Sequence, residues 1–319
     1  MNTSSAGLQP KEQRRILEVI FVYLVSLLIL SVRDPYLAKD AQAYIDILQY
    51  EIPYSGEWGF FLYNQLVHNI LNFNGGDYLI LTSGIMLTIY LISFYRLGIR
   101  DIRILFLLAS PAAILLSING IRQGFALAIL TLIFSFNSKW VWMGLIVIAS
   151  GFHKGSLVIG LFGLIFIVFN KYYKNDNLLF ITLPIISFIL SYIALPFLML
   201  YSKVEAFSNM GFNSGNTFYI RLAVYLMLYS FVVYRIRVIR SVRYISDYFM
   251  ASTISLVLLF QNVPYFSSRL AYFLEIFLLI SFLLRVPAYS MPNRIFYFSS
   301  AVIFMLLIYS YPSVRLQMF

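Results

Sequence analysis

The sequence has no cysteine and only two histidines among its 319 residues. The lack of cysteine excludes disulfide bonds, thiolate catalysis and cysteine-ligated metals. Two histidines are too few for a histidine-rich metal site. We therefore expect any chemistry to use neither a metal nor another cofactor.

Charge is scarce as well, and the composition differs from that of a soluble domain. Only 11% of the residues are charged, whereas 61% are hydrophobic and 18% are aromatic, and the mean hydropathy is +0.83. These values indicate that the lipid bilayer is the protein's solvent. The chain can hold roughly a dozen spans of about 20 residues, which leaves no stretch for a separate soluble domain. We expect one all-α, polytopic transmembrane domain over residues 1–319.

Apolar runs predict about 11 membrane-spanning helices. They cover residues 16–32, 78–95, 104–118, 121–137, 140–152, 155–170, 178–201, 217–235, 247–263, 270–285 and 295–311. The first run follows Lys11, Arg14 and Arg15 and so resembles a signal peptide, but small residues typical of a cleavage site are missing after it. We therefore interpret it as an uncleaved span.

Basic residues between these runs predict the orientation of the chain. With the amino terminus in the cytoplasm, most basic residues fall in cytoplasmic segments, as the positive-inside rule requires. The basic residues left outside are Arg33, Lys39, Arg122, Lys154, Lys203, Arg221, Arg269 and Arg315. Because the net charge of +10 is explained by topology, we do not expect nucleic acid as a partner.

The longest connection, residues 33–77, is an acidic external loop by this topology. Its second half, from Gly59 to Phe73, is apolar but interrupted by polar residues, including Asn64 and His68. That pattern is typical of a helix that lies in the membrane interface or re-enters from outside.

Arg122 is the first candidate for chemistry, in the external segment Asn119-Gly120-Ile121-Arg122-Gln123. A guanidinium group grips phosphate oxygens in bidentate fashion and keeps its charge, which suits a pyrophosphate headgroup at the membrane surface. The alternative is an arginine that snorkels to the interface or pairs with an acid of the external loop.

His153 and Lys154 form the second candidate, at the external end of the fifth predicted span. The imidazole can act as a general base or donate a hydrogen bond to a phosphate leaving group, and Lys154 adds positive charge. The alternative is that His153 is a polar cap and that Lys154 flanks the helix end.

Two acids of the external loop, Asp40 and Glu57, form the third candidate. Either carboxylate can accept the proton of an incoming sugar hydroxyl, and Tyr44 or Trp58 can stack on a sugar ring. The alternative is that these acids simply belong to a solvated loop.

Arg269, Tyr272 and Glu275 recur at spacings of three, which places them on one helical face. Glu275 lies well inside a predicted span, and an acid in that place indicates a site unless an arginine pairs with it for structural reasons. Arg221, near the external end of another span, either joins this cluster or anchors its own helix.

Taken in order, these elements resemble the EpsG family of exopolysaccharide and O-antigen polymerases, the Wzy-type enzymes of bacterial inner membranes. The elements are Asp40-x-x-x-Tyr44, Glu57-x-Gly59-Phe60, Asn119-x-x-Arg122-Gln123 with Ala126, Phe152-His153-Lys154 and Arg269-x-x-Tyr272-Phe273. Together they span most of the chain, and their order is more specific than any single element.

The resemblance implies a GT-C-like scaffold that polymerises undecaprenyl-pyrophosphate-linked oligosaccharide repeat units at the periplasmic face. The growing glycan would leave one lipid carrier and join the sugar on another, with membrane lipid and a chain-length regulator protein as further partners. In the resulting hypothesis, Arg122 binds the donor pyrophosphate with Arg269 and Arg221, and Asp40, Glu57 or His153 accepts the proton.

Two other functions remain open at this point. A related transferase or ligase would move one sugar or a finished glycan from the same kind of carrier. A flippase for lipid-linked sugars would need paired repeats and discontinuous helices around a central polar pathway. The candidate residues gather at one face instead, which favours an enzyme.

Overall fold

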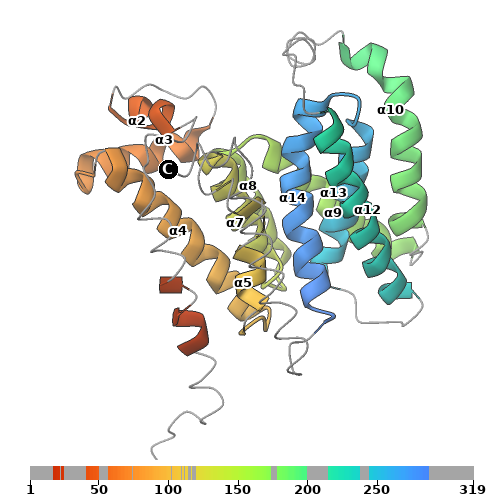
Figure 1. Ribbon diagram of the computed structural model, residues 1–319, viewed down its shortest axis with the longest axis horizontal. Coiled ribbons are helices and arrows are strands. Elements are labelled where there is room, and N and C mark those ends of the chain that lie inside the picture. The colour runs from red at the N-terminus through yellow and green to blue at the C-terminus, as the bar shows by residue number, and fades with distance from the viewer. Residues whose placement is uncertain are drawn as a thin grey trace, which may run out of the picture. The chain divides into compact units, whose positions relative to one another are not determined.

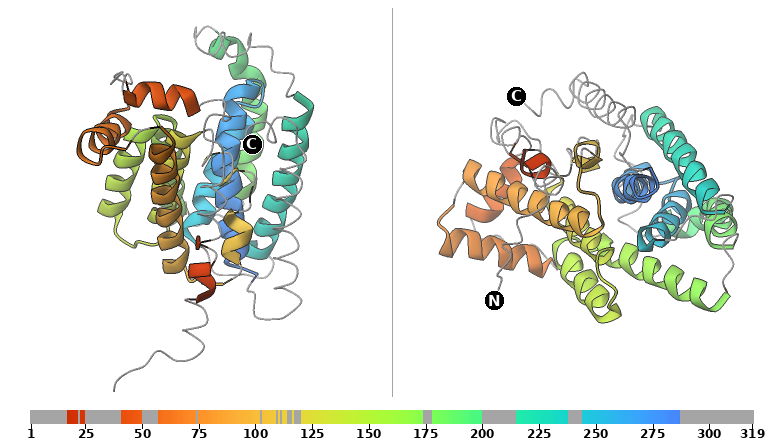
Figure 2. Two further views of the ribbon diagram at one scale, coloured as in Figure 1. Left: turned by 60° about the vertical axis from the view of Figure 1, so that its left-hand side comes forward. Right: turned by 90° about the horizontal axis from the view of Figure 1, so that it is seen from below.

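The computed structural model describes only part of the chain, and every regular element in that part is a helix (Figures 1 and 2). The described residues are 17–21, 23–24, 41–49, 57–73, 75–101, 103–108, 110, 112–113, 116, 120–173, 178–199, 215–237 and 244–286. The prediction of an all-helical protein is confirmed for these residues.

Several of these helices are long and apolar enough to cross a membrane, so the chain is a membrane protein. The long apolar stretches are Gly75–Arg96, Gly155–Tyr172, Tyr219–Ile236 and Phe266–Leu283, and the shorter apolar helices are Ile121–Ile133, Lys139–Phe152, Leu178–Ile193 and Ile245–Leu259. Each falls on a predicted span. The predicted final span, 295–311, lies outside the described residues, and the first is described only in part.

The chain divides into two compact units. The first unit comprises Met1–Tyr54, Phe61–Gly124 and Pro287–Phe319, and the second comprises Ser55–Phe60 and Phe125–Val286. Two helices, α3 (Trp58–Gln65) and α7 (Ile121–Ile133), continue across the boundary. The prediction that the chain forms a single transmembrane domain stays a prediction.

The second half of the long loop is helical, as predicted, and one of its faces is apolar and exposed. Helix α3 continues as a π-helical turn, η2 (Leu66–Ile70). Trp58, Leu62, Leu66 and Ile70 recur every four residues and are 50%, 57%, 48% and 74% exposed. An exposed apolar stripe of this kind buries well into the headgroup region of a bilayer. The structure thus has the surface that an interfacial helix needs.

This placement predicts the fluorescence of Trp58. The chain has three tryptophans, so replacing the other two, Trp140→Phe and Trp142→Phe, leaves Trp58 as the only reporter. In liposomes we expect lipids brominated near the headgroup to quench its emission more than lipids brominated near the chain end. Quenching by aqueous iodide alone would place α3 outside the bilayer.

In the second unit, α12 (Gly215–Arg237) and α14 (Pro264–Leu283) run parallel to each other. Phe231 and Phe282 lie 5.6 Å apart between ring centroids, and one turn later the Arg235 guanidinium donates to the Arg285 carbonyl at 3.5 Å. Their carboxyl-terminal ends are therefore neighbours. Since both helices are long enough to span a bilayer, their amino-terminal ends share the opposite side.

Helix α13 (Ile245–Leu259) runs antiparallel to α14, and α9 (Gly155–Tyr173) runs antiparallel to α13. The hydroxyls of Ser246 and Ser281 are 3.0 Å apart, so the start of α13 meets the end of α14. Asn170, near the end of α9, donates to the Tyr248 hydroxyl at 2.8 Å. Helices α9, α12 and α14 therefore all begin at the same end of the second unit (Figure 1).

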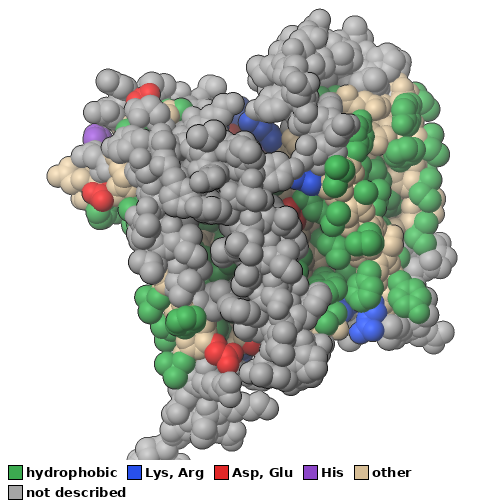
Figure 3. All heavy atoms as spheres, in the orientation of Figure 1, with side chains coloured by type: hydrophobic (Ala, Val, Ile, Leu, Met, Phe, Trp, Pro, Cys, Tyr) green, Lys and Arg blue, Asp and Glu red, His purple; other side chains and the backbone are tan. Residues whose placement is uncertain are grey.

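The outward surfaces of α10 (Leu183–Met199) and α12 are covered by hydrophobic side chains (Figure 3). The exposed large residues on these two helices are Ile185, Ile186, Phe188, Ile189, Leu190, Tyr192, Ile193, Tyr219, Ile220, Val224, Leu226, Met227, Phe231 and Tyr234. So many exposed apolar side chains on neighbouring turns would be unfavourable in water but are ordinary for a surface in contact with lipid tails.

Candidate functional site

The predicted site residues are divided between the two units. Tyr44, Arg122 and Gln123 belong to the first unit, whereas Glu57, His153, Lys154, Arg221, Arg269 and Tyr272 belong to the second. Asp40 and Asn119 lie outside the described residues. Each group is described below by itself.

Arg122 is the second residue of α7, so its charge adds to the positive end of the helix dipole. Its guanidinium carbon lies 5.9 Å from the centroid of the Tyr44 ring on α2 (Ala41–Gln49). Tyr44 is buried, as is Gln123, the residue after Arg122. A guanidinium held over an aromatic ring at a helix amino terminus is well placed to bind an anion.

A chain of polar residues connects this arginine to α3, and the sequence alone did not reveal it. Tyr78, at the start of α4 (Gly75–Arg96), is fully buried and lies within electrostatic range of Arg122 and Tyr44. Its hydroxyl donates to Asn64 Oδ1 at 2.7 Å. The spacing of Asn64 and Tyr78 gave no signal because the two residues lie on different helices.

Tyr63 lies beside this chain of polar residues. Its hydroxyl is 2.8 Å from Thr82 Oγ1, and its ring centroid is 6.2 Å from that of Tyr78. Burial raises the pKa of Tyr63 to about 12, so its phenol remains protonated at neutral pH. Tyr63 is thus a neutral hydroxyl group beside this chain rather than an anion.

In the second unit, two glycines bring the segment of Glu57 against the segment of His153. A Cβ atom on Gly59 would lie 3.0 Å from the backbone of Gly151, so any larger residue would push α3 away from α8 (Lys139–Phe152). Gly151 lies two residues before His153. Glu57 precedes α3 and is only 8% exposed, which removes it from the solvated loop that the sequence also allowed.

His153 caps the carboxyl-terminal end of α8, and its ring is fixed from two sides. Its Nδ1 atom accepts a hydrogen bond from the backbone N–H of Gly155 at 3.1 Å. Its ring lies edge-on to Phe273 of α14, with centroids 6.4 Å apart. In a neutral imidazole this bond leaves the proton on Nε2, so His153 is better suited to donate to a phosphate oxygen than to act as a general base. Lys154 is exposed beside it.

Four residues of α12 and α14 form a polar cluster inside the bundle. Arg221 makes a side-chain hydrogen bond with Tyr272 and lies within electrostatic range of Tyr225 and Glu275. The Tyr225 hydroxyl donates to Glu275 Oε2. Tyr272 and Glu275 therefore lie on one helical face, as predicted. Of the two alternatives for Arg221, the structure supports the one in which it joins this cluster. Arg269 is exposed one turn before Tyr272.

The bond between Tyr225 and Glu275 gives a stability prediction. Tyr225→Phe removes a donor from a carboxyl group that is only 6% exposed, and we expect a loss of about 1–3 kcal/mol. Thermal unfolding of the purified protein in detergent measures it. Tyr234→Phe, on the exposed side of the same helix, is the matched control and should change the midpoint little. Equal midpoints for the two variants would show that the Tyr225 bond adds no stability.

A buried ion pair lies at the other end of the bundle and was not predicted. Arg285 donates to both oxygens of Asp247, at 2.8 and 2.5 Å, and the two side chains are 2% and 0% exposed. The backbone N–H of Tyr244 also donates to Asp247, at 2.7 Å. The predicted spans held a signal for it, since Asp247 begins one span and Arg285 ends the next, which an antiparallel pair brings together.

Comparison with known proteins gives one match. The model of the EpsG family matches residues 16–317, which is nearly the whole chain. No curated protein and no solved structure shows significant similarity to it.

Proposed function

Because the chain belongs to the EpsG family, we propose that it polymerises undecaprenyl-pyrophosphate-linked oligosaccharide repeat units into O-antigen or exopolysaccharide at the periplasmic face of the bacterial inner membrane. A GT-C-like scaffold is part of the same proposal. The residues and helix ends described above supply the chemistry that such a reaction needs.

The observation that carries the proposal is the gathering of cationic side chains at helix amino termini. Helices α9, α12 and α14 begin at one end of the second unit, where Lys154 directly precedes α9 and Arg221 and Arg269 lie in the second turns of α12 and α14. Arg122 lies in the first turn of α7. Positive side chains and helix dipoles at the same ends favour binding of phosphate groups. Under the predicted topology, all these ends face the periplasm.

The proposed reaction is the displacement of one lipid carrier by a sugar hydroxyl. The acceptor oxygen forms a bond to the anomeric carbon of the donor glycan, while the bond from that carbon to the phosphate oxygen breaks. The lipid pyrophosphate leaves with the electron pair of that bond, so negative charge grows on it. Arginines that interact more strongly with the phosphate in the transition state than in the ground state lower the barrier of the reaction.

The acceptor hydroxyl must also lose its proton. Of the two predicted carboxylates, Glu57 lies among the described residues and is proposed for this step, with Asp40 as the alternative outside them. Because Glu57 is buried and acceptor-only when ionised, it is suited to receive a proton from a nearby hydroxyl. His153 is assigned to the leaving phosphate instead, since its Nδ1 is already occupied.

Two substrates carry pyrophosphate in this reaction, and each unit has its own cationic group. In the first unit the cation is Arg122, which lies over the Tyr44 ring. In the second unit the cations are Arg221, Arg269 and Lys154. We propose that the two groups bind the phosphates of lipid-linked substrates. A cleft toward the lipid would hold the polyprenyl tails, and a chain-length regulator remains a proposed partner.

A deletion strain tests the activity. We expect deletion of the gene to leave surface glycan of single repeat units on a gel, and the intact gene to restore the long-chain ladder. A ligase would give a different pattern, because its loss leaves no glycan attached at all. A full ladder in the deletion strain would contradict the polymerase proposal.

A further inference from the structure

Glu275 is a buried acid that has no role in the reaction described so far. It lies about three turns into α14, in the middle of a helix long enough to span the bilayer, and is only 6% exposed. A carboxylate in such surroundings is costly unless other groups compensate its charge. The groups around Glu275 therefore indicate what the acid does.

Glu275 and its partners occupy two levels of the bundle. Because α12 and α14 are parallel, both levels can be counted from the amino-terminal ends of these helices. At the level nearer those ends, Arg221 makes a side-chain hydrogen bond with Tyr272. About one turn deeper, the Tyr225 hydroxyl donates to Glu275 Oε2. Arg221 thus lies between a buried acid on one side and the amino-terminal ends of the helices on the other.

Exposure decreases from the helix ends toward Glu275. Arg269 is exposed, Arg221 and Tyr272 are partly exposed, and Tyr225 and Glu275 are 7% and 6% exposed. A phosphate that arrives from the amino-terminal ends therefore meets the two arginines before it meets the acid. Glu275 is placed to act on the phosphate through Arg221 rather than to touch it.

The Glu275 carboxylate and a bound phosphate attract the same guanidinium group. Arg221 lies within electrostatic range of Glu275. Water and salt screen this attraction only weakly, because the carboxylate is buried. The carboxylate offsets part of the arginine's charge, so Arg221 keeps its place while no phosphate is bound and holds a phosphate less tightly than a lone arginine would.

Weaker binding is useful once the bond to the glycan has broken. The lipid pyrophosphate that leaves carries more negative charge than it did in the substrate, so cations that stabilise the transition state also bind this product tightly. Release of a tightly bound product limits turnover in many enzymes. A counter-charge beside the cation lowers the affinity for the product and so shortens this step.

We propose that Glu275 is a positioning residue that holds Arg221 and, as its counter-charge, speeds release of the lipid pyrophosphate after each transfer. The proposal rests on the polymerase function, in which Arg221 binds phosphate. It differs from a purely structural role in the sign of its effect. Loss of an acid that only stabilises the bundle weakens phosphate binding or leaves it unchanged, whereas loss of a counter-charge strengthens it.

Binding of inorganic pyrophosphate measures this sign without requiring catalysis. The probe is titrated calorimetrically into the detergent-purified full chain carrying Arg122→Ala, so that the cations of the second unit are measured. Glu275→Gln keeps the size of the side chain and an oxygen for the Tyr225 bond, and we expect it to bind the probe about tenfold more tightly. Arg221→Ala/Glu275→Gln should bind as weakly as Arg221→Ala, because the acid acts through the arginine.

Three further variants separate the charge from the hydrogen bond and from folding. Tyr225→Phe removes the bond but keeps the carboxylate, so it should not tighten binding. Asp101→Asn also removes the carboxylate partner of an arginine, Arg103 at 2.8 Å, but in the first unit, and should leave the affinity unchanged. Glu275→Asp withdraws the carboxylate by one methylene and should tighten binding about threefold, which carries the test if Glu275→Gln does not fold.

Turnover in liposomes that contain the lipid-linked unit gives a second readout. Glu275→Gln should lower kcat and KM together, each by about fivefold, because substrate binding tightens while product release slows. Unchanged or weaker pyrophosphate binding by the folded Glu275 variants, or no saturable binding by the Arg122→Ala chain, would overturn the counter-charge. Tighter binding that Arg221→Ala abolishes, without any glycan lengthening by the wild type, would overturn the polymerase function and leave the counter-charge standing.

Discussion

Arg122→Ala should abolish the long-chain ladder in a polymerase-null strain and reduce polymer formation by about 100- to 1,000-fold. The expected size is that of losing one group that stabilises growing negative charge in the transition state. Arg122 sits in the first turn of α7 over the Tyr44 ring, where its charge adds to that of the helix amino terminus. Gel analysis of surface glycan measures the effect.

The conservative variant and a matched control sharpen this prediction. Arg122→Lys keeps the charge but loses the bidentate geometry, and we expect about a tenfold loss. Arg100 also lies over a tyrosine, 4.1 Å from the Tyr95 ring centroid, but it belongs to a predicted cytoplasmic loop. Arg100→Ala should therefore keep the ladder. A normal ladder from both Arg122 variants would remove Arg122 from the reaction.

Arg285→Ala should destabilise the protein by about 3–5 kcal/mol, because it leaves the Asp247 carboxylate buried without its charge partner. Asp247→Ala should cost a similar amount for the converse reason. The pair holds the end of α14 to the start of α13. Thermal unfolding in detergent and the yield of folded protein measure the loss.

A double variant separates the charge pair from the shape of the site. Replacing both residues by leucine removes two buried charges at once, and such replacements are often neutral or stabilising. We expect the Asp247→Leu/Arg285→Leu protein to recover most of the stability that either single change loses. A double variant as unstable as the sum of the single ones would show that the two side chains act independently.

The sequence predicted the helices well, because lipid imposes a strong pattern on it. A span must be apolar over most of its length, so the runs at 78–95, 155–170 and 217–235 were plain, and α4, α9 and α12 cover them. The helix in the second half of the external loop was also predicted. Its predicted bounds, Gly59 to Phe73, lie within three residues of the observed Trp58 and Ile70, but its π-helical turn was not predicted, since no sequence pattern marks it.

The site was predicted by residue type but not by partner. Arg122, Glu57 and Arg221 stood out because charges near a membrane are costly and therefore few. The contact of Arg122 with Tyr44, the close approach of Gly59 to Gly151 and the bond of Arg221 to Tyr272 depend on packing between segments far apart in the chain. The sequence also did not decide the role of His153. The role depends on which ring nitrogen carries the proton, and that is set by the hydrogen bond from the backbone N–H of Gly155, which only the structure shows.

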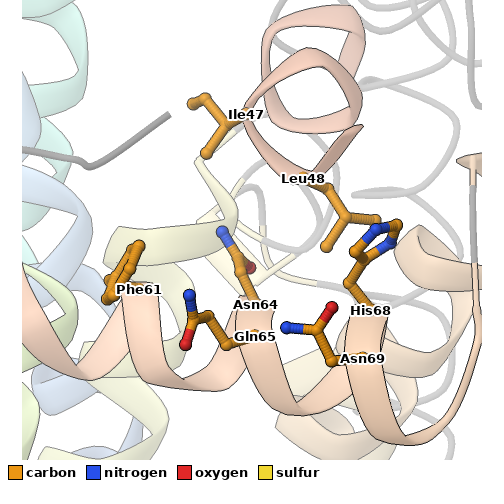
Figure 4. A pocket seen from close by; sticks show the side chains of 7 residues that line it. All are labelled: Ile47, Leu48, Phe61, Asn64, Gln65, His68 and Asn69. Carbon is orange, nitrogen blue, oxygen red and sulfur yellow. The ribbon is translucent and has the colours of Figure 1, made fainter. Parts of the chain in front are cut away.

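The surroundings of Asn64 and His68 also could not be predicted from the sequence. In the sequence they only interrupted an apolar run, and were taken as a sign of an interfacial helix. The structure adds that they lie on the side of α3–η2 that meets α2, opposite residues such as Leu66 and Ile70. Periodicity alone could have separated the two faces of this helix. It could not have shown that Ile47 and Leu48 of α2 lie against the polar face (Figure 4).

Reconstitution with a lipid-linked repeat unit tests the polymerase function most directly. The purified protein is incorporated into liposomes that contain the undecaprenyl-pyrophosphate-linked unit as the only glycan, and glycan length is followed by mass spectrometry. We predict products longer by whole repeat units, with one lipid pyrophosphate freed for each bond formed, and none of either from Arg122→Ala. Glycan that stays at one repeat unit with the wild-type protein, whether or not it crosses the bilayer, would contradict the function proposed here.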